Sequence, residues 1–334
     1  MMGIRWRQTA ALVVCSLWGC TSEVKSGSVQ EARAVNPSGA VEASLTTGDF
    51  RYPDAVRIFS RDFFPEGVAH AADGTFYVGS YSNGQVVRQR PGRPFVEPFI
   101  PANGRAVAGM KVEDATRTLW LCELDLTQAT PDNLRAYDSR SGAPRGAWPL
   151  PLGGGCNDVA LDPQGNVYVT DTYLGVVRRL KRGGTALEAW ATDARFLAPP
   201  GWPGLNGVAW DGGSLYVAKY DSGELFRIGV GASGEAGAIT RITPNAPIGL
   251  PDGILFVSPG VLLVVDNDNG KFLRLDLNGD EAAVTLLATG LDNPTTVAMH
   301  DGDAFVVESQ FDHFFGVDKS PVEVPFIVKR IWLR

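Results

Sequence analysis

Short strand-like segments separated by tight turns fill most of the chain. Residues 157–180 read NDVALDPQGNVYVTDTYLGVVRRL, three short apolar runs that are joined by turns at 162–165 and 173–175. β-Branched and aromatic residues favour strands, whereas Asp, Pro and Gly favour the turns between them. A meander this small cannot bury both of its faces, so it must pack against similar units.

The same pattern recurs along the chain. Similar segments begin at Glu66, Leu205 and Pro251, and weaker copies begin at Ala108 and Pro294. The second residue of each copy serves as a register marker, and these markers are Gly67, Gly109, Asp158, Gly207, Gly253 and Thr295. They are spaced 42 to 49 residues apart, and a blade of four strands takes about 40–50 residues. The sequence therefore predicts an all-β fold, a six-bladed β-propeller with four-stranded antiparallel blades over residues 54–334.

The first 53 residues differ from the rest. Residues 1–19 have a basic start and an apolar run of about ten residues, too short to span a bilayer. Leu17-Trp18-Gly19-Cys20 resembles a bacterial lipobox, so we expect a lipoprotein-type signal peptide and lipidation of Cys20. Residues 20–53 have the composition of a flexible tether. The expected product is exported and membrane-anchored, facing the periplasm or the cell exterior; the alternative is a soluble secreted protein.

Two further features concern how the ring is fastened. Residues 55–59 (AVRIF) read as a strand that would pair with the last blade, which has its own late apolar run at 326–331. Cys122 and Cys156 fall near the same rim of neighbouring blades. Exported proteins can form disulfides, so these cysteines form either a bridge or two buried apolar thiols.

The charge of the chain restricts its partners. The formal net charge is −7, and no block of basic residues occurs after the signal segment. This argues against a nucleic acid and is compatible with a cation.

A column of polar residues emerges when the repeats are aligned. The position before each marker holds Glu66, Ala108, Asn157, Asn206, Asp252 and Pro294. Four of these side chains offer oxygen atoms, and if they converge beside the channel they would form a cage for one divalent cation, Ca²⁺ ahead of Zn²⁺, Mn²⁺ or Mg²⁺. Turn preference alone explains Asn and Asp at such corners, but it does not easily explain Glu66.

These motifs resemble a known family. Glu66-Gly67, Asn157-Asp158, Asn206-Gly207 and Pro251-Asp252-Gly253 are similar to motifs of the regucalcin/gluconolactonase (senescence marker protein) family. The resemblance implies a metal held by Glu66, Asn157, Asn206 and Asp252, and hydrolysis of lactones with Asp252 as the base. That family usually carries Arg two residues before the Asn of the third blade, where this chain has Gly155. The missing arginine argues against a sugar lactone as the substrate, but it leaves the expected metal site unchanged.

A second set of positions ends the second strand of each blade. It comprises Ser80, Glu123, Asp171, Lys219, Asp266 and Glu308. Asp171, Lys219 and Asp266 could shape the mouth of the channel, or they could be hairpin ends in solvent. Trp202 and Tyr173 could wall the mouth, and His313 either faces it or is a satisfied loop histidine.

Two functions fit these observations. The first is an exported metal-dependent hydrolase that acts on a small lactone or ester. The second is a non-enzymatic propeller that binds or scaffolds a partner and whose axial metal is structural.

Overall fold

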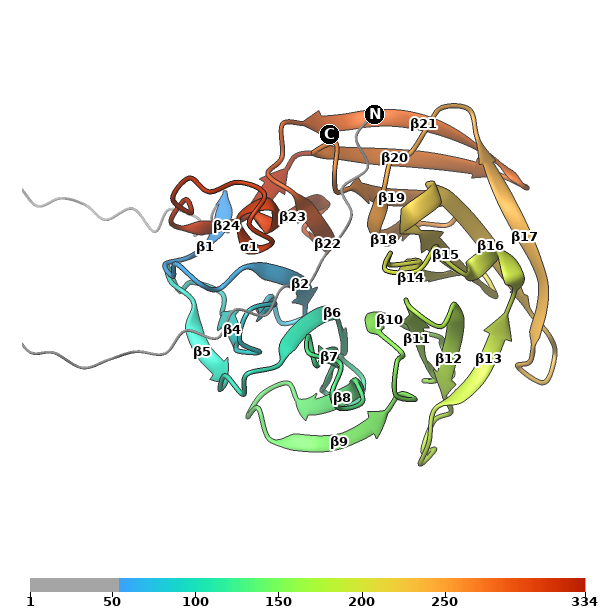
Figure 1. Ribbon diagram of the computed structural model, residues 1–334, viewed down its shortest axis with the longest axis horizontal. Helices are drawn as coiled ribbons and strands as arrows, with labels where there is room; N and C mark the ends of the chain where they lie inside the picture. Colours follow the sequence, from blue (N-terminus) through green and yellow to red (C-terminus); the bar gives the residue numbers. More distant parts are fainter. Residues whose placement is uncertain (1–53, 334) are drawn as a thin grey trace, which may run out of the picture. The chain divides into compact units, whose positions relative to one another are not determined.

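The computed structural model describes residues 54–333, which form 24 strands, two short 3-10 helices and one single-turn α-helix. Figure 1 shows the strands gathered into sheets that surround a common centre. The expected all-β, propeller-like architecture is therefore present. The signal peptide, Cys20 and the tether lie outside the described residues.

Four sheets each contain four strands, and within every sheet neighbouring strands are antiparallel. The first sheet has β2 (Pro65–His70), β3 (Phe76–Ser80), β4 (Val86–Gln89) and β5 (Glu97–Ile100). The second has β6 (Ala106–Glu113), β7 (Thr118–Leu124), β8 (Asn133–Asp138) and β9 (Pro144–Pro149). The third has β10 (Cys156–Leu161), β11 (Val167–Asp171), β12 (Val176–Leu180) and β13 (Glu188–Thr192).

The remaining strands form an eight-stranded sheet and a closing sheet. One half of the larger sheet has β14 (Leu205–Asp211), β15 (Ser214–Lys219), β16 (Glu224–Val230) and β17 (Ala236–Pro244). The other half has β18 (Pro251–Ser258), β19 (Val261–Asp266), β20 (Lys271–Asn278) and β21 (Glu281–Thr289). The two antiparallel halves join only where β17 and β21 pair in parallel, at Thr243↔Glu281 and Pro244↔Ala282. The short helices are η1 (Ala194–Phe196), η2 (Tyr220–Ser222) and α1 (Phe311–Phe314).

The two ends of the described chain close the ring together. The closing sheet has β22 (Pro294–His300), β23 (Asp303–Glu308), β24 (Phe326–Ile331) and, on its outside, β1 (Ala55–Ile58). β1 pairs antiparallel with β24, from Ala55↔Lys329 to Ile58↔Phe326. The expected pairing of the first strand with the last sheet is confirmed, except that the strand ends at Ile58 and Phe59 is exposed.

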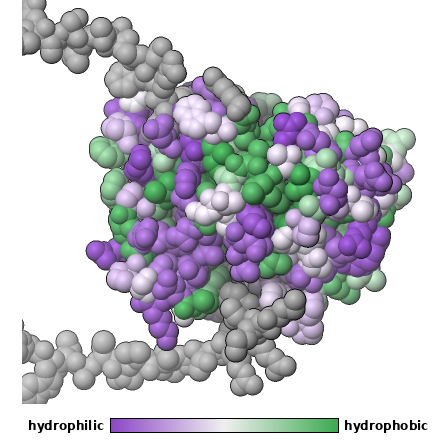
Figure 2. Space-filling view, turned by 90° about the horizontal axis from the view of Figure 1, so that it is seen from above, coloured by the Kyte–Doolittle hydropathy of each residue, from purple (hydrophilic) through white to green (hydrophobic). Residues whose placement is uncertain are grey.

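The buried side chains lie between the sheets. Among residues 54–333 the core divides into six hydrophobic clusters, each contributed by two units that follow one another around the ring. Second strands such as β3, β7 and β11 are buried along their whole length because a neighbouring unit covers each face. Outer strands such as β21 are largely exposed, and Figure 2 shows a mixed hydrophilic and hydrophobic surface on that side of the molecule.

A disulfide joins Cys122 of β7 to Cys156 of β10, so it links the second and third sheets. This confirms the bridge over the alternative of free thiols. No helix within residues 54–333 is long and apolar enough to cross a bilayer.

Ring closure by β1 can be tested with one substitution. The Val56 side chain is fully buried against Phe63, Phe326 and Val328, whereas that of Arg57 is exposed. Val56→Ala should lower the free energy of unfolding by about 2 kcal/mol through lost burial. Arg57→Ala should change it little. Equal effects of the two substitutions in denaturant unfolding would contradict a closing role for β1.

A second prediction concerns pH. The His70 ring packs on Phe76 and His300, and burial together with the His300 charge lowers the pKa of His70 to about 4, against smaller raising effects of Asp73, Asp114 and Asp301. The folded state thus favours neutral His70, so stability should be lost as the pH falls from about 6.5 through about 4. Thermal unfolding across this range should show a shallower loss for His70→Phe, and an unchanged slope would refute the assignment.

Candidate functional site

The column residues sit at a repeated irregularity in the innermost strands. In each of β2, β6, β10, β14 and β18 the pairing register shifts across two residues, the column residue and the marker. In β22 the shift contains Thr295 and Thr296, so the expected alignment of the sixth repeat is wrong by one residue and its column position is Thr295 rather than Pro294. In β2, for example, the shift lies between Pro65 and Val68, and it contains Glu66 and Gly67. Such bulges change the direction of side chains, which is why they are common beside functional sites. The bulge presents one side chain per repeat at the same level of the channel.

The markers are small because neighbouring units approach closely at this level. A Cβ atom on Gly67 would lie 2.2 Å from the carbonyl oxygen of Ala108, and one on Gly207 would lie 2.2 Å from that of Asp252. A Cβ on Gly109 would meet the carboxylate of Asp158. Glycine is therefore required by contact between sheets, and the repeat seen in the sequence records this contact.

Glu66, Asn206 and Asp252 are brought together at the inner rim, and all three are buried. Burial and the charges of Asp252 and Asp158 raise the pKa of Glu66 well above its usual value. Burial and Asp158 likewise raise the pKa of Asp252, while a hydrogen bond from Asn206 lowers it. These effects place the carboxylates within electrostatic reach of one another.

Two oxygen atoms of the column have no hydrogen-bond partner. They are Oε2 of Glu66 and Oδ1 of Asn157, and both are buried. An unpartnered buried oxygen is costly, so such an atom indicates a ligand or ordered water. Amide and carboxylate oxygens are the donors that a hard divalent cation takes. The residues present therefore fit the cation expected at this column.

Asp158 and Lys111 were not among the expected site residues. Burial raises the pKa of Asp158 to about 6, although its carboxylate accepts hydrogen bonds from the backbone N–H groups of Val159 and Val208, at 2.8 and 2.9 Å. Burial lowers the pKa of Lys111 and the charge of Asp158 opposes this. Both line a cavity of about 180 Å³ enclosed by all six innermost strands. The channel therefore carries a half-buried cationic group close to Asp158.

Two tyrosines approach the same carboxylates. Burial and the charges of Glu66 and Asp252 raise the pKa of Tyr81, and burial and Asp252 raise that of Tyr220. The Tyr81 ring also packs on Phe311 and Phe314 of α1, with centroid distances of 4.9 and 5.5 Å. Both tyrosines directly follow the end of a second strand. Side chains alternate between the two sides of a strand. Tyr81 and Tyr220, which follow Ser80 and Lys219, therefore turn toward the column.

The expected charged mouth residues are used inside their own repeats. Asp171 forms an ion pair with Arg178 at 2.6 Å and accepts a hydrogen bond from the backbone of Gly155. Lys219 forms an ion pair with Asp221 at 2.7 Å. Asp266 accepts hydrogen bonds from Leu250 N and the Asn269 amide. All three are buried rather than in solvent, so they fasten hairpin corners.

The other expected mouth residues occupy different places. Tyr173 is 41% exposed at the β11–β12 turn. Trp202 is half-buried in the loop between β13 and β14. His313 lies in α1 with its Nε2 atom 3.9 Å from Oδ2 of Asp318. Its side chain groups with Asp312 and Asp318, with ligand atoms within 4.8 Å of one another.

Comparisons with known proteins relate the chain to others by fold alone. No family model and no curated protein sequence matches it. A gluconolactonase from Xanthomonas campestris superposes with a TM-score of 0.58 at 18% identity, over 76% of this chain and 86% of that one. A luciferin-regenerating enzyme superposes with a TM-score of 0.60 at 15% identity, over 83% and 95% of the two chains.

A lyase shares the same fold. Virginiamycin B lyase from Staphylococcus aureus superposes with a TM-score of 0.52 at 13% identity, over 75% of this chain and 94% of that one. The expected likeness to gluconolactonase therefore holds at the level of a propeller-type fold. Because enzymes of different reactions share that fold, function has to be argued from the site.

Proposed function

We propose that the protein is a divalent-metal-dependent hydrolase of lactones or esters, built on a six-bladed propeller. The observation that carries this proposal is the group of buried carboxylates at the inner rim, together with the unpartnered oxygens of Glu66 and Asn157. Six hydrophobic clusters, and a register shift near the start of each of the six innermost strands, support the blade count, with the eight-stranded sheet counted as two blades.

Charge supports a cation at the rim. Glu66 and Asp252 are buried and Asp158 is half-buried. Burial raises the pKa of all three, and the charge of Asp158 raises those of Glu66 and Asp252 further. Carboxylates that are removed from water in this way must either bind protons or gain a counter-charge. Glu66, Asn157, Asn206 and Asp252 would hold the ion, and their all-oxygen character favours Ca²⁺.

The chemistry follows from the residues around the ion. A bound divalent cation polarises a carbonyl oxygen and lowers the pKa of water. Asp252 would take a proton from the attacking water, and the neighbouring Asn206 side chain lowers the pKa of that carboxylate. The water oxygen bonds to the carbonyl carbon, the ester C–O bond breaks, and the proton passes to the leaving alkoxide.

The sequence and the disulfide both bear on location. The Cys122–Cys156 bridge is typical of an oxidising compartment. Together with the lipobox-like segment ending at Cys20, it supports an exported lipoprotein.

A non-enzymatic binding propeller is the second candidate. It is favoured by one observation: the charged residues around the mouth are engaged in internal pairs, as Asp171 and Lys219 illustrate. A panel of lactones and aryl esters, assayed with Ca²⁺ and with a chelator, separates the two. Chelator-sensitive turnover supports the hydrolase, and its absence in protein that binds Ca²⁺ supports the binding propeller.

Metal binding gives a prediction that is independent of turnover. Glu66→Gln removes one carboxylate from the column and should weaken Ca²⁺ binding at least about tenfold in calorimetric titration. Asp318→Asn is the matched control because it removes a carboxylate from the separate group around His313. If Asp318→Asn weakens binding and Glu66→Gln does not, the ion lies at that group. No binding by the wild type would end the metal assignment.

Asp252→Asn tests the base. The substitution keeps the size and one oxygen donor but removes the proton-accepting site, so hydrolysis at saturating Ca²⁺ should fall by about 10²-fold or more. Asp268→Asn makes the same change at an exposed position near Tyr220 and should have little effect. Normal hydrolysis by Asp252→Asn would restrict Asp252 to a ligand role.

A further inference from the structure

Several large apolar side chains are exposed on neighbouring loops at the end of the sheets where the polar column lies. They are Leu126, Leu152, Tyr173, Leu174 and Leu197, with exposures of 38%, 64%, 41%, 39% and 57%. Their loops all lie at this end because the innermost strands begin there and successive strands alternate in direction. We call these five residues the Tyr173 arc. Contiguous exposed apolar surface marks binding sites more often than chance.

The arc is continuous around Tyr173. A Cβ atom on Gly155 would lie 2.6 Å from Cδ2 of Tyr173, so the ring covers the position where a longer side chain would emerge. A Cβ on Gly175 would lie 3.1 Å from Cδ2 of Leu197, which brings the loop before β14 against the same turn. The Tyr173 hydroxyl interacts with Gln128. The loops that carry Gln128 and Gly155 thus meet the Tyr173 ring, and the loop that carries Leu197 packs on the same turn at Gly175.

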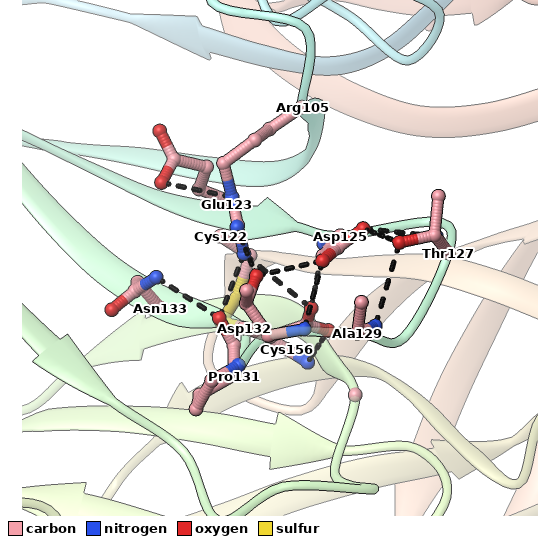
Figure 3. Close-up of polar contacts among 12 residues, drawn as sticks. Arg105, Cys122, Glu123, Asp125, Thr127, Ala129, Pro131, Asp132, Asn133 and Cys156 are labelled. Carbon is pink, nitrogen blue, oxygen red and sulfur yellow. Dashed lines mark hydrogen bonds and ion pairs between the residues drawn. A yellow bond between two sulfur atoms is a disulfide. The ribbon is translucent and has the colours of Figure 1, made fainter.

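The loop that carries Leu126 is held in a fixed shape (Figure 3). Asp125 accepts hydrogen bonds from the backbone and hydroxyl groups of Thr127 and Thr130. Asp132 accepts from the backbone N–H of Asp125 at 2.7 Å and from that of Cys156 at 3.2 Å, beside the disulfide. A surface that is ordered before binding loses less entropy when it takes a ligand.

The arc leads inward to the carboxylates. Tyr81 lies within electrostatic range of Tyr173 and also of Glu66, Asp132 and Asp252, so the arc and the carboxylates share this neighbour. The opposite wall of Tyr81 is aromatic, since its ring packs on Phe311. Asp171 beneath the arc is already paired with Arg178, so it does not add a free charge to this surface. A polyol would find few charged partners here, whereas an alkyl or aryl group would find apolar contacts.

We propose that the Tyr173 arc binds the apolar part of the substrate, an alkyl or aryl substituent on a lactone or ester. This inference rests on the proposed hydrolase function and adds the substrate class. Continuity with the carboxylates through Tyr81 favours a substrate over a membrane or a protein partner. In addition, β1 begins at the end of the sheets away from the arc. Its first residue, Ala55, pairs with Lys329 near the end of β24, whereas its last residue, Ile58, pairs with Phe326 at the start of β24.

A matched pair of lactones tests the assignment. Glucono-1,5-lactone and 5-nonanolide have the same six-membered ester ring but carry hydroxyl groups and an alkyl chain, respectively. The full-length wild type with Ca²⁺ should show a kcat/KM at least about tenfold higher for 5-nonanolide. The double substitution Tyr173→Ala/Leu174→Ala should lower that value about tenfold and change glucono-1,5-lactone turnover less than about twofold. Phe95→Ala, at a 66% exposed position on the β4–β5 loop at the other end, is the control and should change neither.

The outcomes distinguish a failure of the arc assignment from a failure of the proposed hydrolase function. Equal or better turnover of glucono-1,5-lactone would overturn the apolar assignment and leave the hydrolase standing. If Ca²⁺-loaded protein hydrolyses neither lactone, the proposed hydrolase function fails. Binding of 5-nonanolide, followed by saturation-transfer NMR, then tests the arc by itself. Binding that the double variant loses supports an apolar binding site at the arc, and no binding by the wild type overturns it. Binding to phosphatidylethanolamine/phosphatidylglycerol vesicles that the double variant loses, with lactone kinetics unchanged, would make the arc a membrane surface and overturn the proposal.

Discussion

The close approach of the innermost strands is the constraint on which the rest of the structure depends. At the marker level the space between neighbouring units does not admit a Cβ atom at Gly67 or Gly207. Where the bulge has no glycine, in the third and sixth units, a side chain binds the next unit instead. Asp158 accepts from the backbone N–H of Val208 at 2.9 Å, and Thr295 donates to the carbonyl of Glu66 at 2.8 Å. Each unit is thus joined to the next at the level where the column residues project.

Much of the architecture could be predicted from the sequence because this constraint leaves a repeated trace. Glycine after a polar residue, followed by an apolar run, marks three of the six bulges, at Glu66-Gly67, Asn206-Gly207 and Asp252-Gly253. Ring closure by β1 was predictable for a related reason, since an apolar strand such as Ala55–Ile58 needs a partner. The join between β17 and β21 left no such trace, because two residue pairs in parallel impose no composition of their own.

The walls of the site were less predictable than its column. The strand ends at Asp171, Lys219 and Asp266 are the more conspicuous residues in the sequence, yet they are buried and paired within their repeats. Tyr81 and Tyr220, one position later, approach the carboxylates instead. A shift of one residue reverses the side of a strand, and the sequence contains nothing that fixes this register to within one residue. Charge in a sequence therefore predicted polar chemistry without distinguishing internal pairing from a binding role.

Asp158 connects the assembly of the ring to the chemistry proposed for it. Its carboxylate replaces a glycine contact with a hydrogen bond to the next unit, so it serves the fold. It also adds a half-buried negative charge to the buried pair of Glu66 and Asp252 and raises the pKa of both. The positive charge of Lys111 acts on Asp158, where it lowers the pKa of the carboxyl group. A counter-charge at the rim would therefore stabilise the ring and prepare Asp252 for proton transfer at the same time, since both depend on relieving the same repulsion.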